Sequence, residues 1–178
     1  MSSSDNEIQR RAAEVRMIVL DVDGVLTDGR IYLGNKDEEF RTFFVRDGLG
    51  IRMGQSAGLI FGILSGRDSP LVERRARELH IKHIHQGIQD KGPCLEQIAA
   101  KTDLETKQIC FIGDDLIDVP AMRRAGLAAC PADGCEETRQ FAHYICNNKG
   151  GHGAVREVVD LVLRASGRWD TVMQRFLK

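Results

Sequence analysis

The sequence predicts an α/β fold, in which helices cover both faces of a parallel sheet. Short apolar runs without polar alternation, which are typical of strands buried on both faces, recur along the chain. Segments with helical periodicity separate these runs, as expected where crossover helices join parallel strands. Several runs end in acidic or hydroxyl side chains, and ligands bind at the carboxyl ends of such strands. We therefore expect a doubly wound, Rossmann-like sheet with a functional site at one edge.

The amino-acid composition limits the classes of protein to which this chain can belong. Of the 178 residues, 42% are hydrophobic and 29% are charged, as in globular domains. We expect one domain over residues 1–178, because no repeat or low-complexity linker divides the chain. The formal net charge of −1 argues against nucleic-acid binding through bulk positive charge.

The cellular compartment is predicted from the absence of a membrane-spanning run and of a secretory signal. No apolar run approaches the roughly 20 residues that span a bilayer, and no basic segment leads into an apolar run at the start. The five cysteines form no Cys-x-x-Cys pair, so we expect reduced, structural thiols. These features predict a cytoplasmic protein that does not enter membranes.

The first strand is predicted at residues 16–20, after a polar lead-in or short helix. Two strand-like segments between residues 29 and 45 then flank a strong turn signal at Gly34–Asp37. This pattern predicts a β-hairpin flap that projects from the sheet. The flap carries an unusual share of the aromatic residues, namely Tyr32, Phe40, Phe43 and Phe44. It either packs on its own domain or presents an apolar face to another subunit.

Strands and helices alternate after the flap. Further strands are predicted at residues 59–64, 81–85, 108–112 and 127–130. Helices are predicted at residues 46–57, 69–79, 90–100, 119–125 and 154–165, and the short tail at 169–178 can form one more. Ser69 and Pro70 suit the N-cap and the first position of their helix.

Polar groups that can perform chemistry follow the predicted strands. They are Asp21 and Asp23 after the first strand, Ser65 after the second, Lys91 after the third, and Asp114, Asp115 and Asp118 after the fourth. Acidic groups from two strands suit a hard cation, and few protein ligands with retained waters suit Mg²⁺. A hydroxyl and a lysine supply donors for phosphate oxygens. Together with a free carboxylate, this set indicates phosphoryl transfer through an aspartyl-phosphate.

These residues carry a resemblance to a known family. Asp21-Val-Asp23-Gly-Val-Leu-Thr-Asp28, Ser65-Gly-Arg67, Lys91 and Gly113-Asp114-Asp115-x-x-Asp118 resemble, in order, the four motifs of the haloacid dehalogenase superfamily. A finer pattern resembles one branch, the 3-deoxy-D-manno-octulosonate 8-phosphate (KDO 8-phosphate) phosphatases. It comprises Phe43-Phe-Val-Arg46-Asp47-Gly48-x-Gly50, Gln86-Gly-Ile-Gln-Asp90-Lys91 and Gly150-Gly-His-Gly-Ala-Val-Arg156-Glu157.

The resemblance implies a role for each acidic residue. Asp21 would be the nucleophile that accepts the phosphoryl group. Asp23 would protonate the leaving sugar oxygen and later help to activate water. Asp21, the backbone carbonyl of Asp23, and Asp114 would ligate Mg²⁺. Asp115 and Asp118 would support the metal site, although Asp118 also suits a plain helix-start carboxylate.

The resemblance also implies binding roles. Ser65 and Lys91 would hold the phosphoryl oxygens, and Lys91 would offset the charge of the carboxylates. Arg67, next to Gly66, is a candidate for the substrate's carboxylate, because a guanidinium can bind one bidentately. Two more candidate substrate contacts are Arg46 and Asp47. They would equally suit a salt-bridged helix start.

The spacing of the motifs leaves no room for a large cap domain. Only the flap fits after the first motif, and only a helix and a strand fit between Ser65 and Lys91. Such a site stays wet unless a neighbour covers it, and excluding water strengthens its electrostatics. The resemblance implies a homotetramer whose hairpins pack together and help to close adjoining sites.

Three other functions compete with this one. A phosphoryl-accepting receiver domain also uses acids, a hydroxyl and a lysine, but its paired acids come early and its single acceptor aspartate late. A non-catalytic, regulatory phosphatase-like module is a second alternative. The third is the same chemistry on a nine-carbon 2-keto-3-deoxy sugar 9-phosphate. The branch resemblance itself implies an enzyme that makes precursor for lipopolysaccharide in a Gram-negative cytoplasm.

Overall fold

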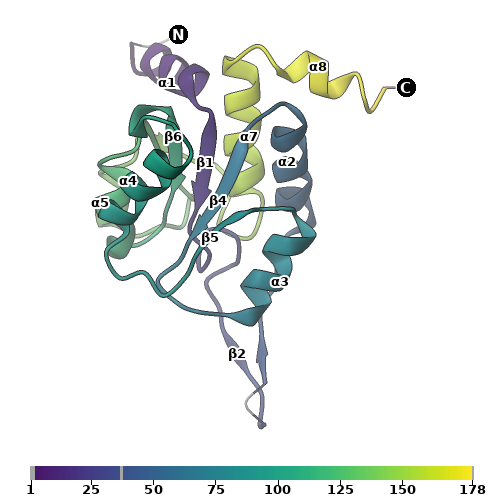
Figure 1. Ribbon diagram of the computed structural model, residues 1–178, viewed down its shortest axis with the longest axis vertical. Coiled ribbons are helices and arrows are strands. Elements are labelled where there is room, and N and C mark those ends of the chain that lie inside the picture. Colours follow the sequence, from purple (N-terminus) through teal and green to yellow (C-terminus); the bar gives the residue numbers. More distant parts are fainter. Residues whose placement is uncertain (1–2, 37, 178) are drawn as a thin grey trace.

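A parallel sheet forms the centre of the protein. The structure is a computed structural model that describes residues 3–36 and 38–177. The six-stranded sheet has the order β5-β4-β1-β6-β7-β8, and each neighbouring pair is parallel (Figure 1). Its strands are β1 (Met17–Leu20), β4 (Ile60–Leu64), β5 (His83–His85), β6 (Ile109–Ile112), β7 (Leu127–Cys130) and β8 (Tyr144–Ile145).

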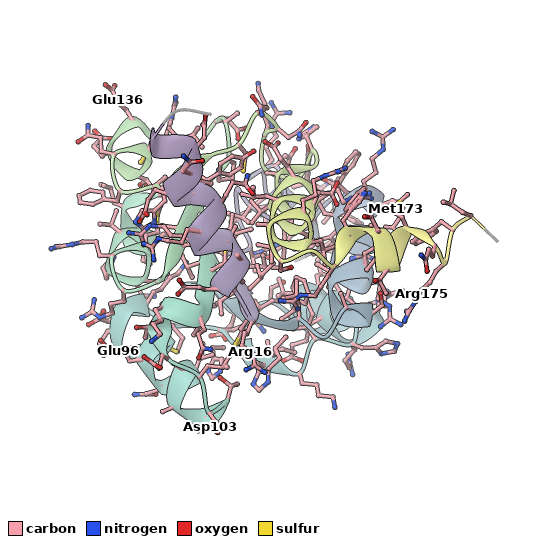
Figure 2. All side chains as sticks on the ribbon, turned by 90° about the horizontal axis from the view of Figure 1, so that it is seen from above. Arg16, Glu96, Asp103, Glu136, Met173 and Arg175 are labelled. Atoms are coloured by element: carbon pink, nitrogen blue, oxygen red, sulfur yellow. The ribbon has the colours of Figure 1, made fainter. Side chains whose placement is uncertain are left out.

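Helices cover both faces of this sheet, which confirms the predicted α/β architecture. One face carries α1 (Ser3–Glu14), α2 (Val45–Ser56), α3 (Pro70–Glu78) and α7 (Ala154–Ala165), and the other carries α4 (Lys91–Lys101) and α5 (Val119–Met122). Figure 2 looks onto the end of the sheet where Arg16 precedes β1; helix α8 (Trp169–Met173) lies at this end.

Strand β1 shows why its sequence has no polar alternation. Ile18 and Leu20 pack into the core beneath α2 and α7. Met17 and Val19 point to the opposite face and pack into the core beneath α4. Successive strand side chains alternate between faces, so a strand covered on both sides must be apolar at every position.

The predicted hairpin is present, but it is shorter than expected. Its strands are β2 (Tyr32–Leu33) and β3 (Glu39–Phe40), which pair in antiparallel fashion. The hairpin projects beyond the rest of the molecule, at the bottom of Figure 1. Leu33 is 79% exposed and Phe40 is 59% exposed, so part of its apolar surface packs on nothing in this chain. Of the turn signal, Asp37 lies outside the described residues.

Four local features differ from the predictions. Strand β8 and helix α6 (Glu136–Arg139) were not predicted, because elements of two and four residues are too short to show a period. The helix predicted at residues 119–125 is split into a 3₁₀ turn, η2 (Leu116–Asp118), and the short α5. A second 3₁₀ turn, η1 (Thr106–Gln108), precedes β6.

Two further features concern the thiols and the lengths of the helices. All five cysteines are free thiols, and four of them are buried. In the part of the chain that the structure describes, every helix is too short or too polar to cross a membrane.

Candidate active site

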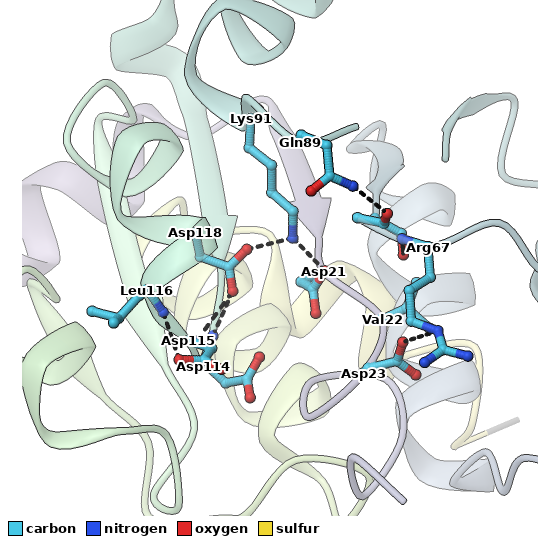
Figure 3. Close-up of polar contacts among 12 residues, drawn as sticks. Asp21, Val22, Asp23, Arg67, Gln89, Lys91, Asp114, Asp115, Leu116 and Asp118 are labelled. Atoms are coloured by element: carbon cyan, nitrogen blue, oxygen red, sulfur yellow. Dashed lines mark hydrogen bonds and ion pairs between the residues drawn. The ribbon is translucent and has the colours of Figure 1, made fainter. Parts of the chain in front are cut away.

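Two neighbouring strands bring the acidic residues together. β1 and β6 pair in register, with Leu20 opposite Ile112, so both strands end at the same level of the sheet. The backbone N–H of Asp21 donates to the carbonyl of Ile112 over 3.0 Å, which extends this pairing into the acidic loop. Asp21, Asp114 and Asp118 each offer a carboxylate oxygen, and these oxygens lie within 4.8 Å of one another (Figure 3).

Lys91 is the cation within this acidic cluster. It is the first residue of α4, and its side chain is 1% exposed. Its Nζ lies 2.5 Å from Oδ1 of Asp21 and 2.5 Å from Oδ1 of Asp118. Burial opposes the lysine's positive charge, but the two carboxylates outweigh burial and raise the pKa of Lys91. The ammonium form therefore prevails at neutral pH.

Asp118 holds the loop after β6 in place. Its Oδ2 accepts the backbone N–H groups of Asp114 over 2.9 Å and Asp115 over 3.3 Å, while its Oδ1 faces Lys91. The side chain is fully buried. Asp115 is exposed, and its Oδ1 accepts the N–H of Leu116 over 2.7 Å, which caps η2. Asp118 thus connects the lysine to the backbone that carries Asp114.

The electrostatics of the cluster favour a bound cation. Three carboxylates face one ammonium group. Burial, together with repulsion from Asp21 and Asp118, raises the pKa of Asp114 to about 8. Burial and repulsion from Asp118 also raise the pKa of Asp21, against the pull of Lys91. A divalent cation would relieve this repulsion, and a set of carboxylate oxygens matches the preference of Mg²⁺.

Gly24 brings the loop after β1 close to Asp114. Its φ of +92° lies in the left-handed region, and a Cβ built there would lie 2.1 Å from Oδ2 of Asp114. Only glycine fits this close approach without strain. The glycine that follows Asp-x-Asp therefore sets the distance between the two acidic loops.

Asp23 points away from this cluster. Its Oδ1 accepts a hydrogen bond from Nη1 of Arg41 over 2.7 Å, and its Oδ2 lies 4.0 Å from Nε of Arg67. The side-chain carboxylate of Asp23 is therefore not among the groups that surround Lys91. The β1 strand ends at Leu20, so the two-residue alternation no longer applies at these positions.

Ser65 anchors the loop that follows β4. It is 2% exposed; its N–H donates to the carbonyl of His85, and its carbonyl accepts the N–H of Ile88. Its Oγ accepts the N–H of Arg67 over 3.3 Å. Gln89 donates to the carbonyl of Gly66 over 3.1 Å (Figure 3). The loop is thus fixed beside β1, with Arg67 directed at Asp23.

Arg46 and Asp47 have other partners. Asp47 is 1% exposed, and its carboxylate accepts the N–H groups of Gly153 over 3.2 Å and Arg156 over 2.8 Å. It therefore caps the N-terminus of α7. Arg46 lies over the ring of Phe44 and lines a separate cavity of about 440 Å³. The structure places neither side chain in the acidic cluster.

Arg41 is the site residue that sequence reasoning missed. It contacts Asp23 from the hairpin, 18 positions along the chain. The local sequence shows only Glu39 and Arg41 on one face of a short strand, which is typical of a solvated surface pair. Nothing in that pattern indicates the long-range partner.

Comparisons with known proteins agree with this geometry. Residues 80–158 match the haloacid dehalogenase-like hydrolase family. The 3-deoxy-D-manno-octulosonate 8-phosphate phosphatase KdsC of Yersinia pestis is 43% identical over 163 residues, which are 92% of this chain and 87% of that protein. Its namesake in Escherichia coli K12 is 41% identical over 164 residues, with the same coverage of both chains.

Solved structures show the same likeness. The Moraxella catarrhalis phosphatase of this name, in complex with magnesium, phosphate and KDO, has a TM-score of 0.94 and 42% identity, covering 96% of this chain and 98% of that one. The cobalt-bound Haemophilus influenzae phosphatase has a TM-score of 0.90 and 35% identity, covering 94% and 99%. The chain therefore belongs to the haloacid dehalogenase-like hydrolases and, among them, to the family of the 3-deoxy-D-manno-octulosonate 8-phosphate phosphatases.

Proposed function

We propose that this protein is a Mg²⁺-dependent phosphatase that hydrolyses KDO 8-phosphate to KDO and inorganic phosphate, in the synthesis of lipopolysaccharide precursor. The observation that carries the proposal is the buried cluster of Asp21, Asp114 and Asp118 around Lys91 at the edge of the sheet. The substrate is inferred from the relatives named above, because they match this chain over most of its length and share its fold.

The reaction begins with Asp21. Its carboxylate attacks phosphorus, and the bond to the sugar oxygen breaks as that oxygen takes a proton from Asp23. Water, deprotonated by Asp23, then attacks the aspartyl-phosphate, which releases phosphate and restores the Asp21 carboxylate. Asp21, Asp114 and the backbone carbonyl of Asp23 would hold Mg²⁺, which would supply positive charge to the phosphoryl oxygens.

Lys91 is suited to hold a phosphoryl oxygen as well as to balance the carboxylates. An ammonium group has three N–H donors, and Asp21 and Asp118 take two of them. The third is available to the substrate. Ser65 supplies a hydroxyl from the neighbouring loop, and Asp115 and Asp118 keep the loop of Asp114 in position.

The sugar acid is proposed to bind beside the phosphoryl site. Arg67, with the backbone of Gly66, is the candidate for its carboxylate, because the exposed guanidinium lies next to Asp23. Arg46 stays a predicted substrate contact, and Asp47 stays a predicted residue of the substrate site. Asp47 would act on the substrate indirectly, since it caps α7.

The assembly is part of the proposal. Residues 1–178 would form one cytoplasmic phosphatase domain without a cap, and the flap at about residues 29–45 would pack against other subunits in a homotetramer. The exposed Leu33 and Phe40 at the hairpin support this packing, because the chain itself leaves them uncovered.

Phosphate release from a panel of sugar phosphates, with and without Mg²⁺, tests the proposed activity. We expect Mg²⁺-dependent release that is fastest on KDO 8-phosphate and abolished by Asp21→Asn. Faster release from a nine-carbon 2-keto-3-deoxy sugar 9-phosphate would keep the mechanism and change the substrate. No release from any ester by the folded protein would contradict the proposal and favour a regulatory module.

A further inference from the structure

Arg41 is buried although it belongs to an exposed hairpin. Its side chain is 1% exposed, whereas Leu33 and Phe40 of the same hairpin are largely exposed. Arginine is almost never fully buried unless its charge is paired. Arg41 is therefore the residue through which this exposed hairpin contacts the rest of the domain.

Those contacts lead to the acidic loop. Nη1 of Arg41 donates to Oδ1 of Asp23 over 2.7 Å, and Nε donates to Oε1 of Glu39 over 2.6 Å. Among the described residues, the buried Nη2 has no hydrogen-bond partner. Leaving a buried donor unpaired costs about 1–3 kcal/mol, so hairpin stability alone does not account for this placement.

Asp23 is held from two sides. Arg41 engages one carboxylate oxygen, and Nε of Arg67 lies 4.0 Å from the other. The two arginines come from different segments, the hairpin and the loop after β4. A carboxylate with a guanidinium at each oxygen has little freedom to rotate, and general acid catalysis requires such fixed geometry.

We propose that Arg41 is a positioning residue, which orients the carboxyl group of Asp23 towards the leaving-group oxygen and links the hairpin to the reaction. This inference rests on the proposed function, in which Asp23 protonates the leaving group. Arg41 need not touch the substrate. Its effect passes through Asp23 alone. In the step that transfers the phosphoryl group to Asp21, this effect therefore depends on how much the leaving group needs a proton.

Leaving-group dependence tests this role. A sugar oxygen is a poor leaving group that needs protonation, while p-nitrophenolate leaves without a proton. The ratio kcat/KM reports only the steps up to departure of the leaving group, before Asp23 activates water. We expect Arg41→Ala to lower kcat/KM on KDO 8-phosphate and on phenyl phosphate by about tenfold to a hundredfold. The kcat/KM on p-nitrophenyl phosphate should stay unchanged. Arg41→Lys, which keeps one donor, should recover most of the loss.

The controls separate positioning from structural damage. Arg52→Ala removes an exposed arginine of α2 that donates a hydrogen bond to Oε1 of Gln55 over 3.1 Å, and it should leave all three rates unchanged. An equal loss on all three esters, in either Arg41 variant, would overturn the inference in favour of a structural role. No loss on any ester would overturn it as well. If the wild-type protein hydrolyses none of the three esters, the proposed function fails first and this inference fails with it.

Discussion

Lys91 shows at the scale of one residue how the site is held together. Replacing one partner of a buried ion pair leaves the other charge uncompensated, which costs more than the pair contributes as a whole. Here a single ammonium group lies between the carboxylates of Asp21 and Asp118. Asp118 in turn accepts the backbone N–H of Asp114 and so fixes the loop that carries this residue. Lys91 thus holds the site together, in addition to the phosphoryl-binding role proposed for it.

Lys91→Met should unfold more easily and be inactive. We expect the free energy of unfolding without Mg²⁺ to fall by about 3–5 kcal/mol, because Asp21 and Asp118 lose their counter-charge. Urea unfolding measures the change. Lys101→Met, in the last turn of the same helix, is the matched control and should be neutral. A Lys91→Met protein of wild-type stability would show that the cluster is not held by this lysine.

Gly24→Ala should weaken Mg²⁺ binding. The new Cβ would meet Oδ2 of Asp114, and the positive φ adds backbone strain. Gly58→Ala is the matched control, since Gly58 has a similar φ of +85° but open space around it. Isothermal titration with Mg²⁺ should show lower affinity for Gly24→Ala alone. Equal affinities in the two variants would mean that Asp114 does not bind the metal.

At the scale of one element, helix α7 and the glycine-rich stretch before it contact the segments next to the site. Asp47 caps the helix N-terminus, and the preceding Gly151 donates its N–H to the carbonyl of Val25 over 2.9 Å. A Cβ on Gly150 would lie 1.8 Å from the carbonyl oxygen of Gly24. The glycine-rich stretch therefore packs directly on the loop after β1, which explains why small residues are needed there.

Glu157 connects the same helix to β8. Burial opposes its ionisation, but hydrogen bonds from the N–H of Asn147, the hydroxyl of Tyr144 and the N–H of Asn148 outweigh burial and lower its pKa from 4.5. A lowered pKa in the folded state adds stability above pH 4.5, and that stability is lost as the pH falls through the folded-state pKa.

Glu157→Gln should therefore be less stable at pH 7 but not in acid. We expect a loss of roughly 1–2 kcal/mol at pH 7, because hydrogen bonds to a charged acceptor weaken. The difference from wild type should vanish below the folded-state pKa. Urea unfolding across this pH range measures it, with the exposed Glu137→Gln as control. A difference that persists in acid would contradict the charge-based explanation.

Elements with a clear period were predictable, and short ones were not. The buried strands and the amphipathic α7 follow from apolar patterning alone. β8 pairs through only two residues, so its existence depends on β7 beside it rather than on its own sequence. The hairpin was predictable from its turn signal, whereas its true strand lengths depend on packing that local sequence does not encode.

At the scale of the whole molecule, parallel topology accounts for most of the site. Because parallel strands end at one edge, the order of the strands predicts that Asp21, Asp114 and Lys91 lie close together, as they do in the structure. Side-chain direction beyond a strand end was not predictable. The contact of Asp23 with Arg41 could therefore not be predicted. The same holds for Asp47, which was expected as a substrate contact but caps α7.

The proposed tetramer is also tested at this scale. Charges on the exposed hairpin should separate the subunits, because burying an unpaired carboxylate in an apolar contact carries a large free-energy penalty. We expect the double variant Leu33→Asp with Phe40→Asp to be monomeric by light scattering and less active on the sugar phosphate. The exposed Leu177→Asp, far from the hairpin in sequence, is the control. A wild-type protein that is monomeric and fully active would contradict the assembly.

The central claim is that Asp21 carries the phosphoryl group during turnover. The most direct measurement is mass spectrometry of the acid-quenched protein during hydrolysis of KDO 8-phosphate with Mg²⁺. We predict a phosphoryl group on Asp21 in the wild-type protein and none in Asp21→Asn. Phosphate release without any modified Asp21, or with the phosphoryl group on another residue, would contradict the proposed mechanism.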